Sequence, residues 1–230
     1  MRRLIIGMTG STGAIFGIRM LEALKGSDVE SHLIISKWAQ RTIEHETRHT
    51  VEQVRALATV VHSQGDMGAS ISSGSFITEG MVVIPCSVRT LGGIANGYGE
   101  HLVHRAADVV LKERRKLVLV VRETPLHTGH LKSMLAASEA GAVILPPVPA
   151  FYNQPKTLEQ VIDHTVGRVL DRFDIAHELS PRWGEPSEGG SAPLPNLPPG
   201  FSSEGAAPPS EPPRGLRGQS PRSKRGDDDR

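Results

Sequence analysis

The chain has 230 residues, 22% of them charged, and a formal net charge of +1 at pH 7. A charge so close to zero argues against the basic surface that nucleic-acid-binding proteins need, so we expect no nucleic-acid partner. The single cysteine, Cys86, excludes an intramolecular disulfide framework and fits a reducing cytoplasm. No apolar run approaches the length of a membrane span, which predicts a cytoplasmic protein without a membrane partner.

Apolar runs alternate with amphipathic stretches through the first 183 residues. The runs have the length of buried strands, and the amphipathic stretches have the spacing of a helical face. The pattern predicts strands at residues 4–8, 29–36, 81–85, 117–121 and 142–145, and helices at 14–24, 37–46, 127–140 and 157–177, with further helical stretches after Thr90 and around Arg105 and Lys112. This alternation indicates a doubly wound α/β fold with a mainly parallel sheet.

The composition changes after Trp183. More than half of residues 184–230 are Gly, Pro or Ser. Such a segment cannot bury enough apolar surface to offset the entropy of ordering the chain. We therefore predict a single domain at residues 1–183, which is enough for one complete core, and a disordered tail at residues 184–230.

The first predicted strand is joined to the first predicted helix by Thr9-Gly10-Ser11-Thr12-Gly13. Glycines let the backbone turn tightly, and the amides at a helix start attract phosphate. The segment lacks the G-x-G-x-x-G pattern of dinucleotide-binding folds, which leaves a mononucleotide such as FMN as a candidate ligand. The alternative is an ordinary turn between a strand and a helix.

Hydroxyl side chains follow two other predicted strands. Ser36 ends the second strand, and Ser87 and Thr90 follow the third. The carboxyl ends of parallel strands meet at one edge of the sheet, where open α/β sheets bind ligands. We therefore expect these hydroxyls to share one crevice, although each one alone is equally explained as a helix N-cap.

A group of charged residues surrounds the predicted strand at 117–121. Arg105 and Lys112 are seven residues apart on one predicted helix, so they share a helical face. Arg122 and Glu123 follow the strand at its carboxyl end. Two cations on one face and an arginine at a strand end suit an oxyanion, with phosphate as the first choice. The alternative is a solvated helix face.

Residues 45–49 match the zinc-protease pattern H-E-x-x-H, in which His45 and His49 bind the metal and Glu46 is the general base. The candidates for a third ligand are His101, His104, His127 and His130, but none stands in a recognisable zinc-protease extension. The α/β pattern of the chain also disfavours a zinc protease, so we predict no metal site. Cys86 has no catalytic partner at a recognisable spacing, which favours a buried cysteine at the end of a strand. Tyr152 follows a proline-rich loop and can either contact a ligand or pack on the sheet edge.

Taken together, these segments resemble the UbiX family of flavin prenyltransferases, including members named as aromatic-acid decarboxylase subunits. The likeness extends from about residue 2 to residue 185. It rests on the number and order of the motifs, which are Gly10-Ser11-Thr12-Gly13, Ile35-Ser36-Lys37, Ser72-Ser73-Gly74-Ser75-Phe76, Pro85-Cys86-Ser87, the run at 105–113, Arg122-Glu123-Thr124-Pro125-Leu126, the run at 149–155 and Pro181-Arg182-Trp183-Gly184.

The resemblance implies a flavodoxin-like or Rossmann-like domain that assembles as a dodecamer and binds FMN at subunit interfaces. It implies a metal-independent enzyme that joins the dimethylallyl group of dimethylallyl monophosphate to N5 and C6 of reduced FMN. The product, prenylated FMN, would serve a UbiD-type decarboxylase. Two alternatives are an FMN-dependent decarboxylase with its own substrate, which would need a catalytic histidine and a substrate clamp, and a non-enzymatic flavin carrier.

The resemblance also assigns residues to roles. Tyr152 and Arg168 would hold the dimethylallyl phosphate, while Glu46 would be an acid near the flavin and Trp183 part of an aromatic wall beside the allyl group. Arg105, Lys112, Arg122 and Glu123 would surround the departing phosphate. The residues that would contact FMN are Gly10, Ser11, Thr12, Ser36, Ser87, Val88, Arg89, Thr90 and Arg122.

The chain departs from the family pattern in two places. Thr12 stands where serine is common, which keeps the hydroxyl but adds a methyl group near the expected flavin N5. Ser87-Val88-Arg89-Thr90 replaces the frequent Ser-Met/Ile-Lys-Thr and keeps both the charge and the hydroxyls.

Overall fold

The centre of the protein is a sheet of six parallel strands, seen in a computed structural model that describes residues 2–182. Trp183 and the predicted tail at 184–230 lie outside the described residues. The strands are β1 (Arg2–Met8), β2 (Val29–Ile35), β3 (Val60–His62), β4 (Gly80–Cys86), β5 (Lys116–Val121) and β6 (Ala142–Ile144).

The strand order is β3-β2-β1-β4-β5-β6, and every neighbouring pair is parallel. This is the Rossmann order of a doubly wound sheet, so the predicted fold class is confirmed. The order reverses between β1 and β4, and in such sheets the ligand crevice lies at the carboxyl ends of these strands. The short strand β3 was not among the predicted strands.

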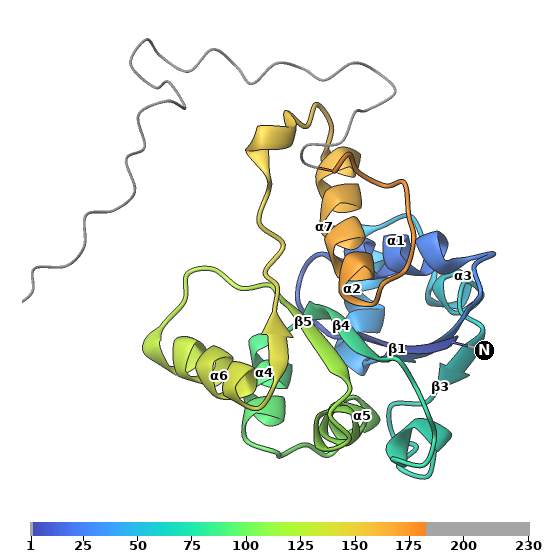
Figure 1. Ribbon diagram of the computed structural model, residues 1–230, viewed down its shortest axis with the longest axis vertical. Coiled ribbons are helices and arrows are strands. Elements are labelled where there is room, and N and C mark those ends of the chain that lie inside the picture. Colours follow the sequence, from blue (N-terminus) through green and yellow to red (C-terminus); the bar gives the residue numbers. More distant parts are fainter. Residues whose placement is uncertain (1, 183–230) are drawn as a thin grey trace, which may run out of the picture. The chain divides into compact units, whose positions relative to one another are not determined.

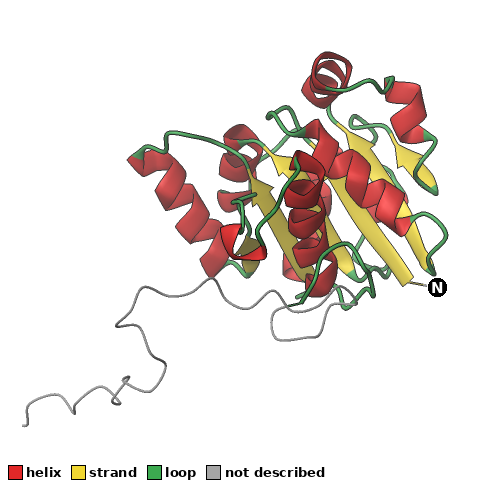
Figure 2. Ribbon diagram, turned by 90° about the horizontal axis from the view of Figure 1, so that it is seen from above, coloured by secondary structure: helices red, strands yellow, loops and turns green. Residues whose placement is uncertain are grey.

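Helices cover both faces of the sheet (Figures 1 and 2). The buried side chains form one cluster between the sheet and α1, α2, α3 and α7, and a second between the sheet and α4, α5, α6 and η1. The helices are α1 (Ala14–Leu24), α2 (Lys37–Glu46), α3 (Val51–Arg55), α4 (Val88–Ala95), α5 (Leu102–Lys112), α6 (Thr128–Glu139) and α7 (Leu158–Arg172), with short 3-10 turns η1 (Ser70–Ser72) and η2 (Phe151–Asn153).

Cover on both faces explains the near-continuous apolar character of the central strands. All seven residues of β4 are buried, as expected for a parallel strand between two helical layers.

Hydroxyl side chains fix where α2 and α4 begin. The Ser36 Oγ accepts a hydrogen bond from the Ala39 amide, and the Ser87 Oγ accepts one from the Thr90 amide. Both serines are therefore N-caps as well as strand-end residues.

The last helix is shorter than the predicted span of 157–177. It ends at Arg172, because Asp174 has a φ of 54° in the left-handed region and the Ile175 amide turns back to the Leu170 carbonyl. The Arg2 guanidinium donates hydrogen bonds of 2.6 Å to the Phe173 carbonyl and 3.2 Å to the Asp174 carbonyl. The beginning of β1 therefore satisfies carbonyl groups just beyond the end of α7.

Within residues 2–182, no helix is long and apolar enough to cross a membrane.

Candidate functional site

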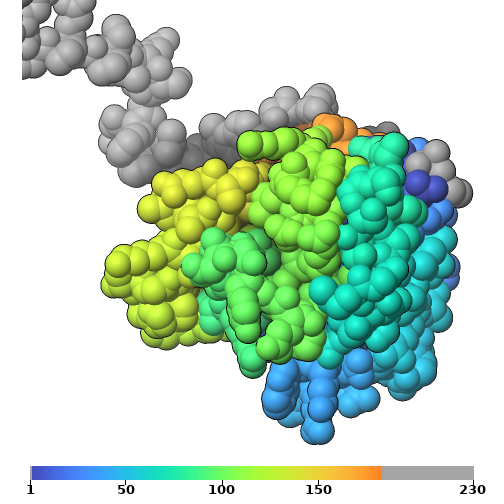
Figure 3. All heavy atoms as spheres, turned by 90° about the horizontal axis from the view of Figure 1, so that it is seen from below, coloured from blue at the N-terminus to red at the C-terminus, as the bar shows by residue number. Residues whose placement is uncertain are grey.

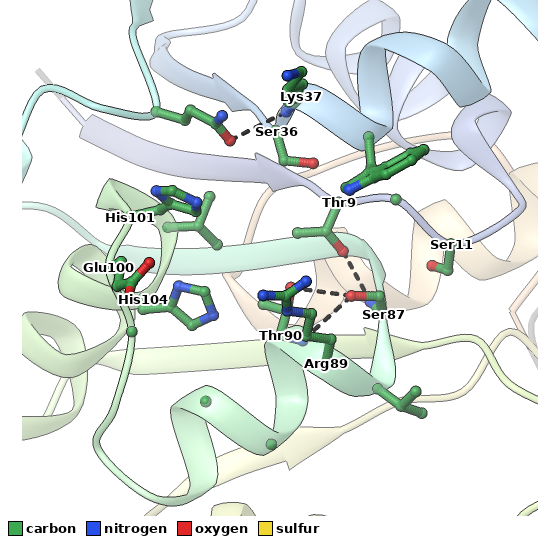
Figure 4. A pocket seen from close by; sticks show the side chains of 18 of the residues that line it. Thr9, Ser11, Ser36, Lys37, Ser87, Arg89, Thr90, Glu100, His101 and His104 are labelled. Carbon is green, nitrogen blue, oxygen red and sulfur yellow. Dashed lines mark hydrogen bonds between the residues drawn. The ribbon is translucent and has the colours of Figure 1, made fainter.

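A cavity of about 930 Å³ lies at the carboxyl ends of five strands. Residues that follow β1, β2, β3, β4 and β5 form one part of its lining, and α4, the segment that leads to α5 and the first turn of α5 form the rest. Figure 4 shows Ser11 at one side of this cavity and His101 and His104 at the other. The volume is at the upper end of the range of about 300–1,000 Å³ that is usual for small-molecule sites.

A hydrogen-bond network fixes the polar floor of the cavity. The Thr9 Oγ1 donates to the Pro85 carbonyl at 2.8 Å and accepts a hydrogen bond of 2.8 Å from the Ser87 amide. The Ser87 Oγ donates to the Thr90 Oγ1 at 3.1 Å and accepts a hydrogen bond of 3.2 Å from the Thr90 amide (Figure 4). The turn after β4 is therefore tied to β1, and both predicted hydroxyls, Ser87 and Thr90, line the cavity.

Two helix N-termini present open amides to the cavity. In the described part of the chain, the backbone N–H groups of Trp38 in α2 and of Val88 and Arg89 in α4 have no hydrogen-bond partner. Open amides and the positive end of a helix dipole together attract anions. The guanidinium of Arg89, which also lines the cavity, adds a positive charge. These groups suit an anion such as phosphate.

The N-terminus of α1 is different, because a carboxylate occupies it. The Glu46 Oε2 accepts hydrogen bonds of 2.8 Å from the Gly13 amide and 3.1 Å from the Ala14 amide. Gly10 and Ser11 line the cavity, but Thr12 and Glu46 are not among its lining residues in the described range. The phosphate site indicated by the geometry therefore lies at α2 and α4 rather than at the loop before α1.

Two buried polar atoms in the cavity wall have no hydrogen-bond partner among residues 2–182. These are the Ser11 Oγ and the His104 Nδ1. Burial lowers the pKa of His104, and the nearby charges of His101 and Arg89 lower it further, so the neutral imidazole is favoured. Both atoms are closed to solvent in this conformation, so each would reach a ligand only after its side chain turned. The cavity itself offers an anion the open helix amides and the Arg89 guanidinium.

Glu123 lines the same cavity from the carboxyl end of β5, as the sequence predicted for its strand position. Its neighbour Arg122 is fixed there by a backbone hydrogen bond of 3.1 Å to the Cys86 carbonyl. The Arg122 side chain is not part of the described cavity lining. Of the four charged residues predicted around the strand at 117–121, Glu123 is therefore the one that the fold brings to the cavity.

Arg105 and Lys112 lie together on α5, facing the loop at residues 72–76. The Arg105 Nε donates a hydrogen bond of 3.1 Å to the Ser72 carbonyl, and its guanidinium pairs with Asp108. Lys112 forms an ion pair with Glu113, and both side chains lie against Gly74. Figure 3 shows the teal segment that contains this loop beside the green residues of α5. The predicted shared face is present.

Within one chain, however, this cationic face is separated from the cavity. Lys112 ends α5 four residues before β5 begins at Lys116, so it lies near the amino end of that strand, while Arg122 follows its carboxyl end. Neither Arg105 nor Lys112 lines the cavity in the part of the chain that the structure describes. A single copy therefore does not bring the predicted cations around one phosphate.

Tyr152 and Arg168 form a third group, beside α7. The Tyr152 ring stands edge-on to the His164 ring at 6.1 Å between centroids. Burial lowers the pKa of His164, and the charge of Arg168 lowers it further. Arg168 stands about one helical turn after His164 on α7, so the two residues share a helical face. A hydrogen bond of 2.9 Å between Asn153 and His164 fixes η2 on the helix. The two predicted substrate-binding residues are thus neighbours, but on the opposite face of the sheet from α5 (Figure 1).

The zinc-protease geometry is not formed. Helix α2 ends at Glu46, so His45 and His49 do not share a helical face, and Glu46 binds backbone amides instead. Between residues 2 and 182, no group of three His, Cys, Asp or Glu side chains could hold a metal ion.

Cys86 is buried at the end of β4, where burial raises the pKa of its thiol to about 12. The interpretation of Cys86 as a buried strand-end residue is confirmed.

The predicted site omitted several residues that line the cavity. Thr9 was named only as part of the turn, and His101 and His104 only as possible third zinc ligands. Lys37 was named only as part of the Ile35-Ser36-Lys37 motif, and Trp38, Gln64 and Tyr98 were given no role. Trp38 had a usable signal, because it lies two residues after the strand-end Ser36. The segment at 98–104 had none, because its position depends on the packing of α4 against α5.

Comparisons with known proteins identify the family of this chain. Residues 1–179 match the Flavoprotein family, so the fold and site define an α/β flavoprotein. The flavin prenyltransferase UbiX of Escherichia coli (strain K12) is 55% identical over 186 residues, which are 80% of this chain and 98% of that protein. A probable UbiX-like flavin prenyltransferase of Bacillus subtilis (strain 168) is 53% identical over 191 residues, 82% of this chain and 94% of the relative. The chain belongs to the UbiX family of flavin prenyltransferases.

Two solved structures are similar throughout the domain. AnUbiX (PadA1), crystallised with FMN and dimethylallyl pyrophosphate, has a TM-score of 0.79 and 53% identity, covering 80% of this chain and 98% of that chain. A dodecameric FMN-dependent UbiX-like decarboxylase from Escherichia coli O157:H7 has a TM-score of 0.78 and 55% identity, covering 80% and 100% of the two chains. The family resemblance inferred from the sequence motifs is confirmed.

Proposed function

We propose that this protein transfers the dimethylallyl group of dimethylallyl monophosphate to N5 and C6 of reduced FMN and releases inorganic phosphate. The observation that carries the proposal is the cavity with open helix amides at the carboxyl ends of the strands, in a chain 53–55% identical to flavin prenyltransferases. Reduced FMN, when bound, supplies the two nucleophilic ring positions. A prenyl phosphate supplies the carbon electrophile.

In this proposal, α2 and α4 hold the FMN phosphate. The open amides of Trp38, Val88 and Arg89 donate to its oxygens, and the hydroxyls of Ser36, Ser87 and Thr90 lie at the same helix starts. Backbone donors that are already in place cost no reorganisation when the anion arrives. The Ser11 Oγ and the His104 Nδ1 are buried without a partner, so a turn of either side chain toward the cavity would add a polar contact to the ligand.

Glu123 is the proposed proton carrier. It is exposed to the cavity from a rigid strand end, so a proton can pass between its carboxylate and a ligand. Glu46 takes a different part. Its carboxylate already caps α1 through Gly13 and Ala14, so it holds the loop that carries Ser11. A direct acid role for Glu46 requires that these bonds loosen when the substrates bind.

The phosphate of the prenyl donor needs cations that one chain does not bring together. Arg105 and Lys112 lie on the α5 face of the sheet, whereas Tyr152 and Arg168 lie on the α7 face. We therefore propose that neighbouring copies complete each other's active sites, and that the working form is a homo-oligomer, a dodecamer like the similar Escherichia coli O157:H7 structure. Side-chain cations would then neutralise the leaving phosphate, so that the transfer needs no metal ion.

Trp183 completes the proposal as part of an aromatic wall beside the allyl cation, where a π-face stabilises positive charge. The prenylated FMN would then pass to a UbiD-type decarboxylase, both proteins acting in the cytoplasm.

One observation favours a second candidate function. His101 and His104 line the cavity, and an FMN-dependent decarboxylase with its own substrate would need such a histidine.

The test is anaerobic incubation of the full chain with reduced FMN and dimethylallyl monophosphate, followed by mass spectrometry of the released flavin and an assay of inorganic phosphate. We expect a flavin heavier by one C5 unit and an equal amount of phosphate. Folded, FMN-loaded protein that returns unmodified flavin would refute prenyl transfer. In that case, carbon dioxide release from a panel of aromatic carboxylic acids would test the decarboxylase alternative, with His104→Asn as the diagnostic variant.

A further inference from the structure

Two exposed aromatic side chains line the cavity. The Trp38 side chain is 67% exposed, and that of Tyr98 is 69% exposed. Single exposed apolar side chains are common on protein surfaces and need no explanation. An exposed indole in the wall of a ligand cavity is different, because its apolar surface is available to the ligand.

The base of Trp38 is held firmly although its ring is open. A Cβ atom on Gly10 would lie 2.3 Å from the Trp38 Cβ, so the glycine backbone and the first side-chain carbon of Trp38 are in close contact. The Ser36 cap fixes the helix turn on which Trp38 stands. A tryptophan ring has only two side-chain torsions, so ordering it on a ligand costs little conformational entropy. Trp38 is therefore preorganised for contact with a bound molecule.

Trp38 also contributes an open backbone amide to the phosphate site. A phosphate bonded to this amide places the remainder of the ligand next to the same residue's indole. Gly10 and Ser11 border that part of the cavity, and the Ser11 Oγ is one of the unpaired polar atoms. Trp38 thus combines an open amide for the phosphate with an aromatic surface for a ring.

We infer that the indole of Trp38 packs against the flavin of bound FMN and is a determinant of flavin affinity. The inference rests on the proposed function only in taking FMN as the ligand. Stacking on an aromatic side chain contributes about 1–3 kcal/mol for a nucleic-acid base, and the flavin ring system is a larger heteroaromatic surface. A loss of about 1.4 kcal/mol corresponds to a tenfold change in affinity.

Tryptophan fluorescence can be assigned to Trp38, because the chain has only two tryptophans, Trp38 and Trp183. In a Trp183→Phe background, the emission comes from Trp38 alone. Titration of oxidised FMN into this variant, freed of bound flavin, should quench most of the emission, with a midpoint equal to the Kd from equilibrium dialysis. FMN bound without quenching would overturn the inference.

Affinity in otherwise unchanged full-length protein gives the second measurement. We expect Trp38→Ala to raise the Kd for FMN about tenfold and Trp38→Phe to raise it less than about threefold, because phenylalanine keeps an aromatic face. Phe151→Ala is the matched control, since Phe151 is 78% exposed but does not line the cavity in the described residues. Size-exclusion chromatography with light scattering follows the assembly of each variant.

The outcomes separate the two claims. Wild-type protein that binds no FMN would overturn both the proposed function and the inference. Wild-type binding with an unchanged Kd in Trp38→Ala would overturn the inference alone. An altered assembly in Trp38→Ala with unchanged FMN affinity per subunit would also overturn it, and would assign the exposed indole to a contact between copies.

Discussion

Gly10 is a residue at which the cavity tolerates little change, and Gly10→Ala tests the packing described above. The added Cβ would lie 2.3 Å from the Trp38 Cβ, 3.3 Å from its carbonyl carbon and 3.4 Å from its Cα. Non-bonded carbon atoms are at their optimum about 3.5–4.0 Å apart. The conflict is with atoms attached to the backbone, so no rotamer change can relieve it, and the start of α2 must move by roughly 1 Å.

Forced movement of this kind in packed regions costs about 1–3 kcal/mol. Gly10 has no positive φ, so the cost comes from the contact and not from the backbone conformation of alanine. The same movement shifts the Trp38 amide in the phosphate site. We therefore expect Gly10→Ala to lower the free energy of unfolding by about 2 kcal/mol and to raise the Kd for FMN by at least about tenfold, the equivalent of ~1.4 kcal/mol.

Gly92→Ala is the control. Gly92 lines the same cavity, but no atom lies within 4 Å of the position that an added methyl group would take, and the residue stands inside helix α4. Replacing glycine by alanine inside a helix stabilises by about 0.5–1 kcal/mol. Urea denaturation at one protein concentration compares the two variants, since assembly makes the midpoint depend on concentration. Equal midpoints for Gly10→Ala and Gly92→Ala would refute the packing argument.

Three further predictions test single side chains. Ser87→Ala removes the cap of α4 and the hydrogen bond to the Thr90 hydroxyl. We expect the free energy of unfolding from urea denaturation to fall by about 1 kcal/mol and the Kd for FMN from dialysis to rise. Unchanged values of both would contradict the proposed FMN site. Burial and the charge of His32 lower the pKa of His62, so below pH ~6.5 the unfolded chain binds more protons than the folded chain and stability falls on acidification. His62→Asn should reduce the change in urea midpoint between pH 7 and pH 5. An equal change in the variant would exclude His62 as the source of this pH dependence. Glu123→Gln should slow prenyl transfer by about 10²-fold or more at an unaltered Kd for FMN, so normal single-turnover rates would remove Glu123 from the proton path.

Most of the fold could be predicted because both of its faces are covered. Strands buried on two sides appear in the sequence as continuous apolar runs. The limits of α1 and α2 were predicted correctly because each periodic stretch follows a clear start signal, the glycine turn before Ala14 for α1 and the serine cap Ser36 for α2. Strand β3 was missed because it has only three residues at the edge of the sheet, none of them buried. The end of α7 was placed too late because Asp174 is not an obvious helix terminator, and its conformation depends on contacts with distant residues.

The candidate site could be predicted only where it follows the strands. Ser36, Ser87 and Glu123 come directly after apolar runs, so the shared carboxyl edge of the sheet brings them together. The cations on α5 were expected at the same place, but residues seven apart on a helix are separated by about 10 Å along its axis. Lys112 therefore lies near the amino ends of the strands, away from the cavity. Two residues on one helical face can lie at opposite ends of the neighbouring strands, because the helix runs along the sheet.

The bonds from Arg2 to the carbonyls of Phe173 and Asp174 mean that the two ends of the folded region meet. The chain could therefore be circularly permuted, with a short linker from the residues after α7 to the beginning of β1 and new ends in an exposed turn. All strand neighbours would stay the same, but the contact that now joins residues 171 apart would become a local one. In the natural order, the ribosome synthesises β1 first and the segment after α7 nearly last. The hydrogen bonds between Arg2 and that segment therefore form only after almost the whole domain has been released.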